Sequence, residues 1–135
     1  MHSESALVWF RLRSFARVAA VCLASALACA TAAAEEPVAV HVRLPDPLSP
    51  AARTVKYSDP LDEALRREKL GRVTGGGTQL SRDRRIVSVE LDLELVDVEQ
   101  GVPFVRHALR RLGAPPGSMV EFERFGLAVE LPVHD

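Results

Sequence analysis

Three consecutive glycines, Gly75, Gly76 and Gly77, followed by Thr78, are the sharpest local feature of this 135-residue sequence. Successive N–H groups of a glycine backbone can form a concavity that binds an anion, because no side chain restricts the backbone angles. Phosphate-binding loops also need a lysine and a hydroxyl residue after the last glycine, or a glycine spacing that opens into a helix. Neither occurs here. The favoured interpretation is a bulge that bends a strand, and a ligand- or partner-contacting loop is the alternative.

Acidic residues alternate with apolar ones along the strongest strand pattern of the chain. Glu90, Asp92 and Glu94 occupy the polar positions of that strand, and Glu121 and Glu123 occupy the polar positions of a later one. An antiparallel sheet can leave one face uncovered. We therefore expect an acidic face that suits a basic protein partner or a cationic ligand. The alternative is a solvated face on which cross-strand charge pairs form.

Paired carboxylates could also act as the acid and base of a glycosidase, but such sites need aromatic sugar platforms. Beyond residue 34 the chain has one tyrosine, Tyr57, and no tryptophan. His41, His107 and His134 lack the spacing of metal ligands, and no G-x-S-x-G elbow occurs in the sequence. If His41 and Arg43 lie between the acidic strands, they would form ion pairs there. We expect no catalytic residues, no metal and no cofactor.

A basic cluster of Arg82, Arg84 and Arg85, with Asp83 among them, occupies a polar turn. We expect these charges to be solvated, with partner contact as the alternative. The first 34 residues hold three arginines and Glu4, so the totals of 17 basic and 18 acidic residues leave 14 and 17 beyond them, a net charge of −3. A nucleic-acid binder of this size would carry a basic excess, so this class of partner is excluded.

Residues 1–34 have the pattern of a secretory signal peptide: arginines, then an alanine-rich apolar run, then small residues before a cut after Ala34. The apolar run, residues 18–34, is shorter than the roughly 20 residues that span a bilayer, which disfavours a membrane anchor. A lipoprotein cleaved before Cys29 is the alternative. Both cysteines, Cys22 and Cys29, lie in this leader. We therefore expect a periplasmic or secreted domain without disulfides.

Alternating apolar and polar residues predict five strands, and residues 87–96 have the strongest pattern. The first strand is ambiguous, because residues 38–44 and residues 53–57 both qualify, on either side of a proline-rich stretch. One would be the first core strand and the other an edge strand or an N-terminal arm. The remaining strand segments are residues 72–74 and 78–80 around the triglycine, residues 119–122 and residues 127–131.

Two amphipathic helices are predicted between these strands. Asp59 can cap the first one and Pro60 loses no hydrogen bond in its first turn, while Gly71 would end it in a left-handed conformation. The second covers roughly residues 102–112, and Gly113 follows it.

The predicted element order is β-α-β-β-α-β with an additional C-terminal strand. It favours an α+β fold, a two-layer sandwich of the ferredoxin-like, split β-α-β kind. A plain α+β meander with another strand order is the alternative. The predicted organisation is a signal peptide at residues 1–34, an N-terminal arm or strand with a proline-rich segment at 35–56, and an α+β domain at 57–135.

Three motifs resemble those of small, largely uncharacterised bacterial proteins. They are D-P-L-x-x-A-L at residues 59–65, L-G-x-V-T-G-G-G-T at residues 70–78, and L-R-x-L-G-A-P-x-G at residues 109–117. The resemblance covers residues 57 to about 123, and the triglycine segment is its most specific part. It implies a compact α+β domain and brings no catalytic residues.

These observations together predict an exported, non-enzymatic binding module that engages a protein partner through the acidic sheet face, as an immunity- or inhibitor-like protein would. The alternative is a small-ligand-binding or sensor domain that uses the triglycine loop and forms a homo-oligomer. The candidate partner- or ligand-binding residues are Gly75, Gly76, Gly77, Thr78, Glu90, Asp92 and Glu94.

Overall fold

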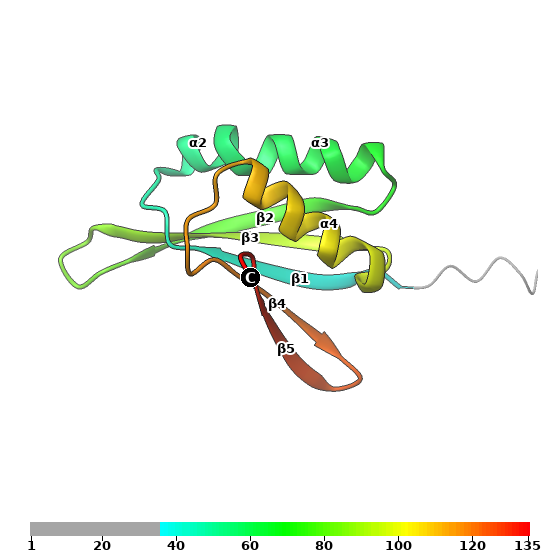
Figure 1. The fold of residues 1–135 in the computed structure, drawn as a ribbon. Coiled ribbons are helices and arrows are strands. Elements are labelled where there is room, and N and C mark those ends of the chain that lie inside the picture. Colours follow the sequence, from blue (N-terminus) through cyan, green and yellow to red (C-terminus); the bar gives the residue numbers. More distant parts are fainter. Residues whose placement is uncertain (1–35) are drawn as a thin grey trace, which may run out of the picture. The chain divides into compact units, whose positions relative to one another are not determined.

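The computed structural model describes residues 36–135, which form one α+β unit (Figure 1). The predicted signal peptide, residues 1–34, lies outside the described residues. The sheet is antiparallel throughout, with the strand order β2-β3-β1-β4-β5. Its strands are β1 (Val38–Leu44), β2 (Gly71–Leu80), β3 (Ile86–Leu95), β4 (Met119–Arg124) and β5 (Leu127–Pro132).

The helices lie together on one face of the sheet (Figure 1). They are α2 (Pro50–Arg53), the π-helical turn η1 (Thr54–Ser58), α3 (Asp59–Arg67) and α4 (Val98–Arg111). This arrangement confirms the α+β class that the sequence predicts and fits a sandwich of one helix layer and one sheet layer. No helix within residues 36–135 is both long enough and apolar enough to cross a membrane.

β1 lies at the centre of the sheet, paired with β3 on one side and β4 on the other. Its Val40, Val42 and Leu44 are buried against the helices, so the alternating pattern of residues 38–44 marks the first core strand. The other candidate for that strand, residues 53–57, is helical instead.

The first helix begins at Pro50 and not at Pro60 as predicted. Its N-cap is Ser49, whose hydroxyl accepts a hydrogen bond from the Ala52 N–H at 3.2 Å. Pro60 lies inside the helical run, where it cannot donate a backbone hydrogen bond. The preceding turn widens accordingly, and the Asp59 N–H bonds to the Thr54 carbonyl, five residues back.

The same helical segment ends at Arg67, the last residue of α3, and Lys69 just beyond it adopts a left-handed conformation with a φ of 56°. The Leu70 N–H then bonds to the Leu65 carbonyl at 2.9 Å, as in a Schellman motif. The prediction that Gly71 caps the helix is therefore wrong. Gly71 begins β2 instead, where a Cβ atom would collide with the carbonyl oxygen of Glu94.

The second helix, α4, begins about one turn before the predicted residue 102, because Asp97 caps it. The Asp97 carboxylate accepts a hydrogen bond from the Glu99 N–H at 2.8 Å. At its other end Gly113 is left-handed, with a φ of 88°, as the glycine after the predicted helix should be. Val105 and Leu109 bury the face that α4 presents to the sheet.

Tyr57 is fully buried and joins the helix layer to the proline-rich loop. Its hydroxyl donates to the Asp46 carboxylate at 2.6 Å, and the Lys56 ammonium donates to the same oxygen at 2.8 Å. Partial burial by itself would raise the pKa of Asp46. The two hydrogen bonds and the charge of Lys56 outweigh it and hold that pKa below its usual value.

Candidate functional site

The sheet face opposite the helices carries no covering element in residues 36–135, and we call it the open face. Because side chains alternate along a strand, the burial of Val40 and Val42 places Ala39, His41 and Arg43 of β1 on this face. The same alternation places three carboxylates of β3 there, together with those of β4 and β5. The carboxylates of the open face are Glu90, Asp92, Glu94, Glu121, Glu123 and Glu130.

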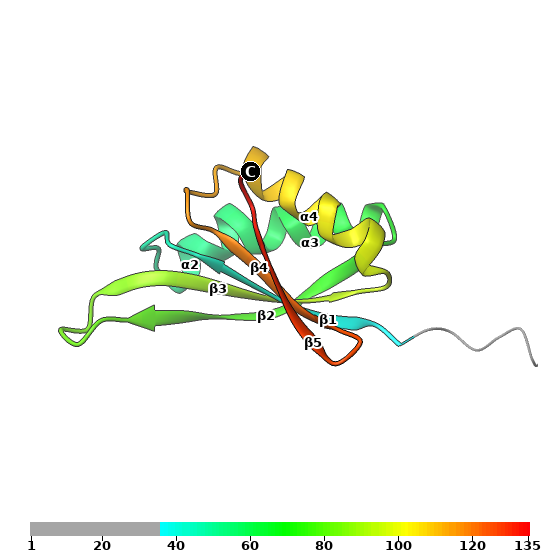
Figure 2. The ribbon, with the colours of Figure 1, turned by 60° about the horizontal axis from the view of Figure 1, so that its bottom comes forward.

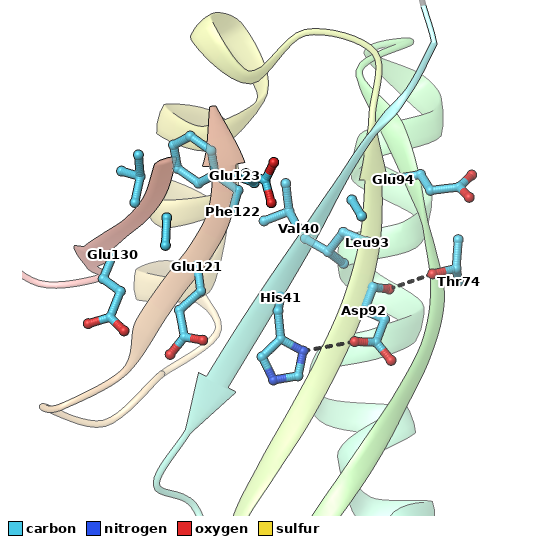
Figure 3. A pocket seen from close by; sticks show the side chains of 13 residues that line it. Val40, His41, Thr74, Asp92, Leu93, Glu94, Glu121, Phe122, Glu123 and Glu130 are labelled. Atoms are coloured by element: carbon cyan, nitrogen blue, oxygen red, sulfur yellow. Dashed lines mark hydrogen bonds and ion pairs between the residues drawn. The ribbon is translucent and has the colours of Figure 1, made fainter. Parts of the chain in front are cut away.

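A hollow of about 440 Å³ lies in the open face (Figure 3). Ala39 and Ala128 contribute only short side chains to its lining, and His41 is its one basic residue. The acidic residues that line it come from three strands: Asp92, Glu94, Glu121, Glu123 and Glu130.

His41 lies at the centre of this face, between β3 and β4 (Figure 3). Its Nδ1 is 2.8 Å from the Asp92 Oδ1, and its Nε2 is 3.9 Å from the Glu90 Oε1. On the other side, Glu121 lies directly opposite His41 in the pairing of β1 with β4. The imidazole therefore has carboxylates of both neighbouring strands around it.

Two arginines neutralise part of the acidic charge. Arg43 of β1 pairs with Glu121 at 3.5 Å, and Arg72 of β2 pairs with Glu94 at 2.8 Å. Neither Glu123 nor Glu130 has an ion-pair partner among residues 36–135. With His41 neutral, the carboxylates that no arginine neutralises are Glu90 and Asp92 on β3, Glu123 on β4 and Glu130 on β5.

Glu121 and Glu130 are directly opposite each other in the pairing of β4 with β5. Their side chains leave the sheet on the same face (Figure 3), and like charges at directly opposite positions destabilise a sheet. A bound cationic group would remove this repulsion. The pair is therefore unfavourable in the free protein and favourable for a basic ligand.

The triglycine belongs to the edge strand β2 and does not form a loop. The strand is bulged at Thr74, where the pairing with β3 shifts between Val73 and Gly75. The Thr74 hydroxyl donates to the Asp92 carbonyl oxygen at 3.1 Å (Figure 3). The bulge thus falls one residue before the triglycine, and the three glycines themselves pair regularly with β3.

The structure divides the triglycine between the two faces of the sheet. Gly75 is opposite Asp92 and Gly77 is opposite Glu90, so both glycines lie beside the acidic residues of the open face. Gly76 faces the helices, where an added Cβ would lie 3.3 Å from the guanidinium carbon of Arg53.

Arg53 holds the helix side of this segment. It donates to the Gly77 carbonyl at 2.7 Å, and its Nη1 lies 3.5 Å from the Thr78 hydroxyl. Of the seven predicted binding residues, Gly76 and Thr78 therefore face away from the hollow, while Gly75 and Gly77 share the open face with the three β3 carboxylates.

The set of candidate residues predicted from the sequence omits four titratable residues that line the hollow: His41, Glu121, Glu123 and Glu130. The alternation of residues 127–131 contains the signal for Glu130, because it puts this residue on the polar side of its strand. The alternation does not show which strands are neighbours in the sheet, and it is this strand order that makes β3, β1, β4 and β5 share one hollow.

Within residues 36–135 no group of three or more histidine, aspartate or glutamate side chains is arranged to hold a metal ion. Comparison of the chain with family models, with curated proteins and with solved structures gave no match. The geometry of the open face is therefore the basis for a functional proposal.

Proposed function

We propose that this protein is an exported, non-enzymatic binding module whose open face engages a basic segment of another protein, as an immunity- or inhibitor-like protein would. The observation that carries the proposal is the hollow lined by five carboxylates, with the opposed pair Glu121 and Glu130 at one side. Six carboxylates against Arg43 and Arg72 give the open face a net charge of −4 with His41 neutral. Such a field attracts and orients a basic partner.

We infer that the fold is ferredoxin-like with one added strand. Along the sheet, β3 lies between β1 and β2, and β1 lies between β3 and β4. Each β-α-β unit is thus split by one antiparallel strand, which is the pattern of that fold, and β5 extends the sheet beyond β4. An experimental structure with another strand order would contradict this inference.

Export is part of the proposal and rests on the sequence pattern of residues 1–34. We expect the protein in the periplasm or the medium of the producing cell, with an N-terminus at residue 35. N-terminal sequencing of the protein from cell fractions tests this. A lipid-modified N-terminus at Cys29 would favour the lipoprotein alternative.

Binding to a protein partner is tested by affinity capture of cell-envelope proteins on immobilised residues 35–135, followed by affinity measurement with the purified partner. The matched variant carries Glu123→Lys and Glu130→Lys, because neither side chain takes part in an ion pair of residues 36–135. We expect it to unfold cooperatively and at no lower temperature than the wild type, and to bind at least about tenfold more weakly, because like charges across an interface cost several kcal/mol. Equal affinity for both proteins would contradict the proposal.

A small cationic ligand is the second candidate, because the volume of the hollow, about 440 Å³, falls in the range of small-molecule sites. The triglycine participates here only through Gly75 and Gly77. Thermal stabilisation by a panel of amines and guanidinium compounds tests this function. A stabilisation that survives the Glu123→Lys and Glu130→Lys changes would place the ligand elsewhere.

A further inference from the structure

The end of the β2–β3 hairpin projects beyond the rest of the sheet. The last residue of β1, Leu44, pairs with Val89 of β3, so residues 80–87 pair only with each other. We call residues 80–87 the arm. Figure 1 and Figure 2 both show it extending past the helices and past the other strands.

The arm is basic and partly apolar. It carries Arg82, Arg84 and Arg85, and its one acidic residue, Asp83, pairs with Arg85 at 3.2 Å. Its net charge is therefore +2. Leu80 is 53% exposed and Val87 is 44% exposed. An exposed hairpin end with these apolar side chains has the composition of an interface more than that of a solvated turn.

We propose that a second copy of this chain occupies the open face, with the arm of each copy in the hollow of the other. This inference rests on the proposed function, because it names one basic segment that the acidic face binds. The arm, at +2, and the open face, at −4, are complementary in charge.

The distances suit a twofold symmetric pair. On β3, Val87 of the arm and Asp92 of the hollow are five residues apart, which is about 17 Å at the usual rise of a strand. A twofold axis that runs above the open face, parallel to the sheet and across β3 midway between them, brings each arm over the hollow of the other copy. Gly77 lies beside this midpoint, opposite Glu90. Without a side chain it lets two sheets approach closely.

The proposal is tested by sedimentation velocity over a wide range of protein concentration, at low and at high salt. We expect the wild type to dimerise, and to dimerise less as salt screens the charges. Arg82→Glu with Arg84→Glu changes the arm from +2 to −2, and Glu123→Lys with Glu130→Lys changes the open face from −4 to 0 and makes its β4–β5 side basic. None of these four side chains forms an ion pair within residues 36–135, so both variants should fold. Each should dimerise at least about tenfold more weakly than wild type.

The mixture of the two variants is the decisive sample. Alone, the arm variant places an acidic arm against an acidic hollow, and the hollow variant has lost the net attraction for its basic arm. Mixed together, they match the native arm with the native hollow, and the acidic arm with the hollow whose β4–β5 side has become basic. We expect a heterodimer in the mixture. A monomeric wild type, a dimer that neither variant weakens, or a mixture that does not associate would overturn the inference. If the wild type is monomeric but its open face still binds a captured basic partner, self-association fails while the proposed function stands.

Discussion

Replacing Glu130 by lysine should make the protein more stable while it weakens binding at the open face. Glu130 lies directly opposite Glu121 in the pairing of β4 with β5. The substitution removes a like-charge pair and creates an opposite-charge pair at the same positions. Cross-strand pairs of this kind contribute roughly 0.2–1 kcal/mol. Glu130 is exposed, so we take the lower half of that range for each of the two effects, and we expect a gain of about 0.5–1 kcal/mol.

The gain is measurable as a melting temperature. For a domain of this size, about 1 kcal/mol shifts the midpoint by roughly 4–8 °C, so Glu130→Lys should raise it by a few degrees at low salt. Glu130→Gln is the matched control, because it removes the repulsion without creating an attraction, and it should give about half of the gain. Differential scanning calorimetry of the three proteins at low and high salt measures both effects, and salt should shrink the differences.

Two results would refute this reasoning. If Glu130→Lys and Glu130→Gln both lower the melting temperature, the repulsion between Glu121 and Glu130 is not real in solution. If Glu130→Lys raises it but leaves binding of the basic partner and self-association unchanged, the carboxylate pair is not part of a binding surface. The combination of higher stability and weaker binding is specific to a residue that is kept for function.

Three further predictions concern the framework of the fold. The folded-state pKa of Asp46 is lowered, so its contribution to stability is present above its ordinary pKa and is lost as pH falls through the folded-state value. Asp46→Asn should therefore destabilise the protein by about 1–3 kcal/mol near neutral pH. Urea unfolding at several pH values should show that the difference from wild type shrinks in acid. Gly76→Ala should destabilise the protein more than Gly75→Ala in the same assay. An added Cβ at Gly76 would lie 2.5 Å from the Glu90 carbonyl oxygen, whereas at Gly75 the nearest atom would be 3.7 Å away. Equal effects would contradict the register of β2. Phe125→Asn should raise the melting temperature. Phe125 is 90% exposed at the tip of the β4–β5 hairpin, and its φ of 53° is a left-handed conformation that asparagine tolerates better than phenylalanine. A lower melting temperature would argue against this turn.

Strand patterns were the most predictable part of the fold, because a strand with one buried face alternates strictly. Residues 38–44 and 87–95 show this alternation, and the structure buries Val40, Val42 and Leu44 in the first and Val89, Leu91, Leu93 and Leu95 in the second. Residues 53–57 have a similar apparent period, yet they are helical. Val55 and Tyr57 would share one face of a strand, but Tyr57 is fully buried and Val55 is 75% exposed. Their separation reflects the contact of Tyr57 with Asp46 in the loop, which no local pattern contains.

The helix start was mispredicted because the chain contains two valid start signals. Ser49-Pro50 and Ser58-Asp59-Pro60 both combine a capping side chain with a proline at the first helical position. The first signal begins the helix, and the second is absorbed by a π-helical turn. The choice depends on the tertiary packing of Tyr57, so residues 50–67 become one nearly continuous helical segment.

Three features of the open face are unfavourable for the isolated chain. Glu121 and Glu130 repel each other across β4 and β5. The triglycine weakens β2, since each of its glycines costs roughly 0.5–1 kcal/mol relative to alanine, and the arm exposes Leu80 and Val87. Glu130→Gln and Gly75→Ala, for example, would each lessen one of these features without disturbing the core. Their presence on one face and at its end is consistent with a surface that is completed by a bound protein. A basic segment in the hollow would neutralise the carboxylates, pack against the backbone that the glycines leave bare and, if it comes from a second copy, cover the arm.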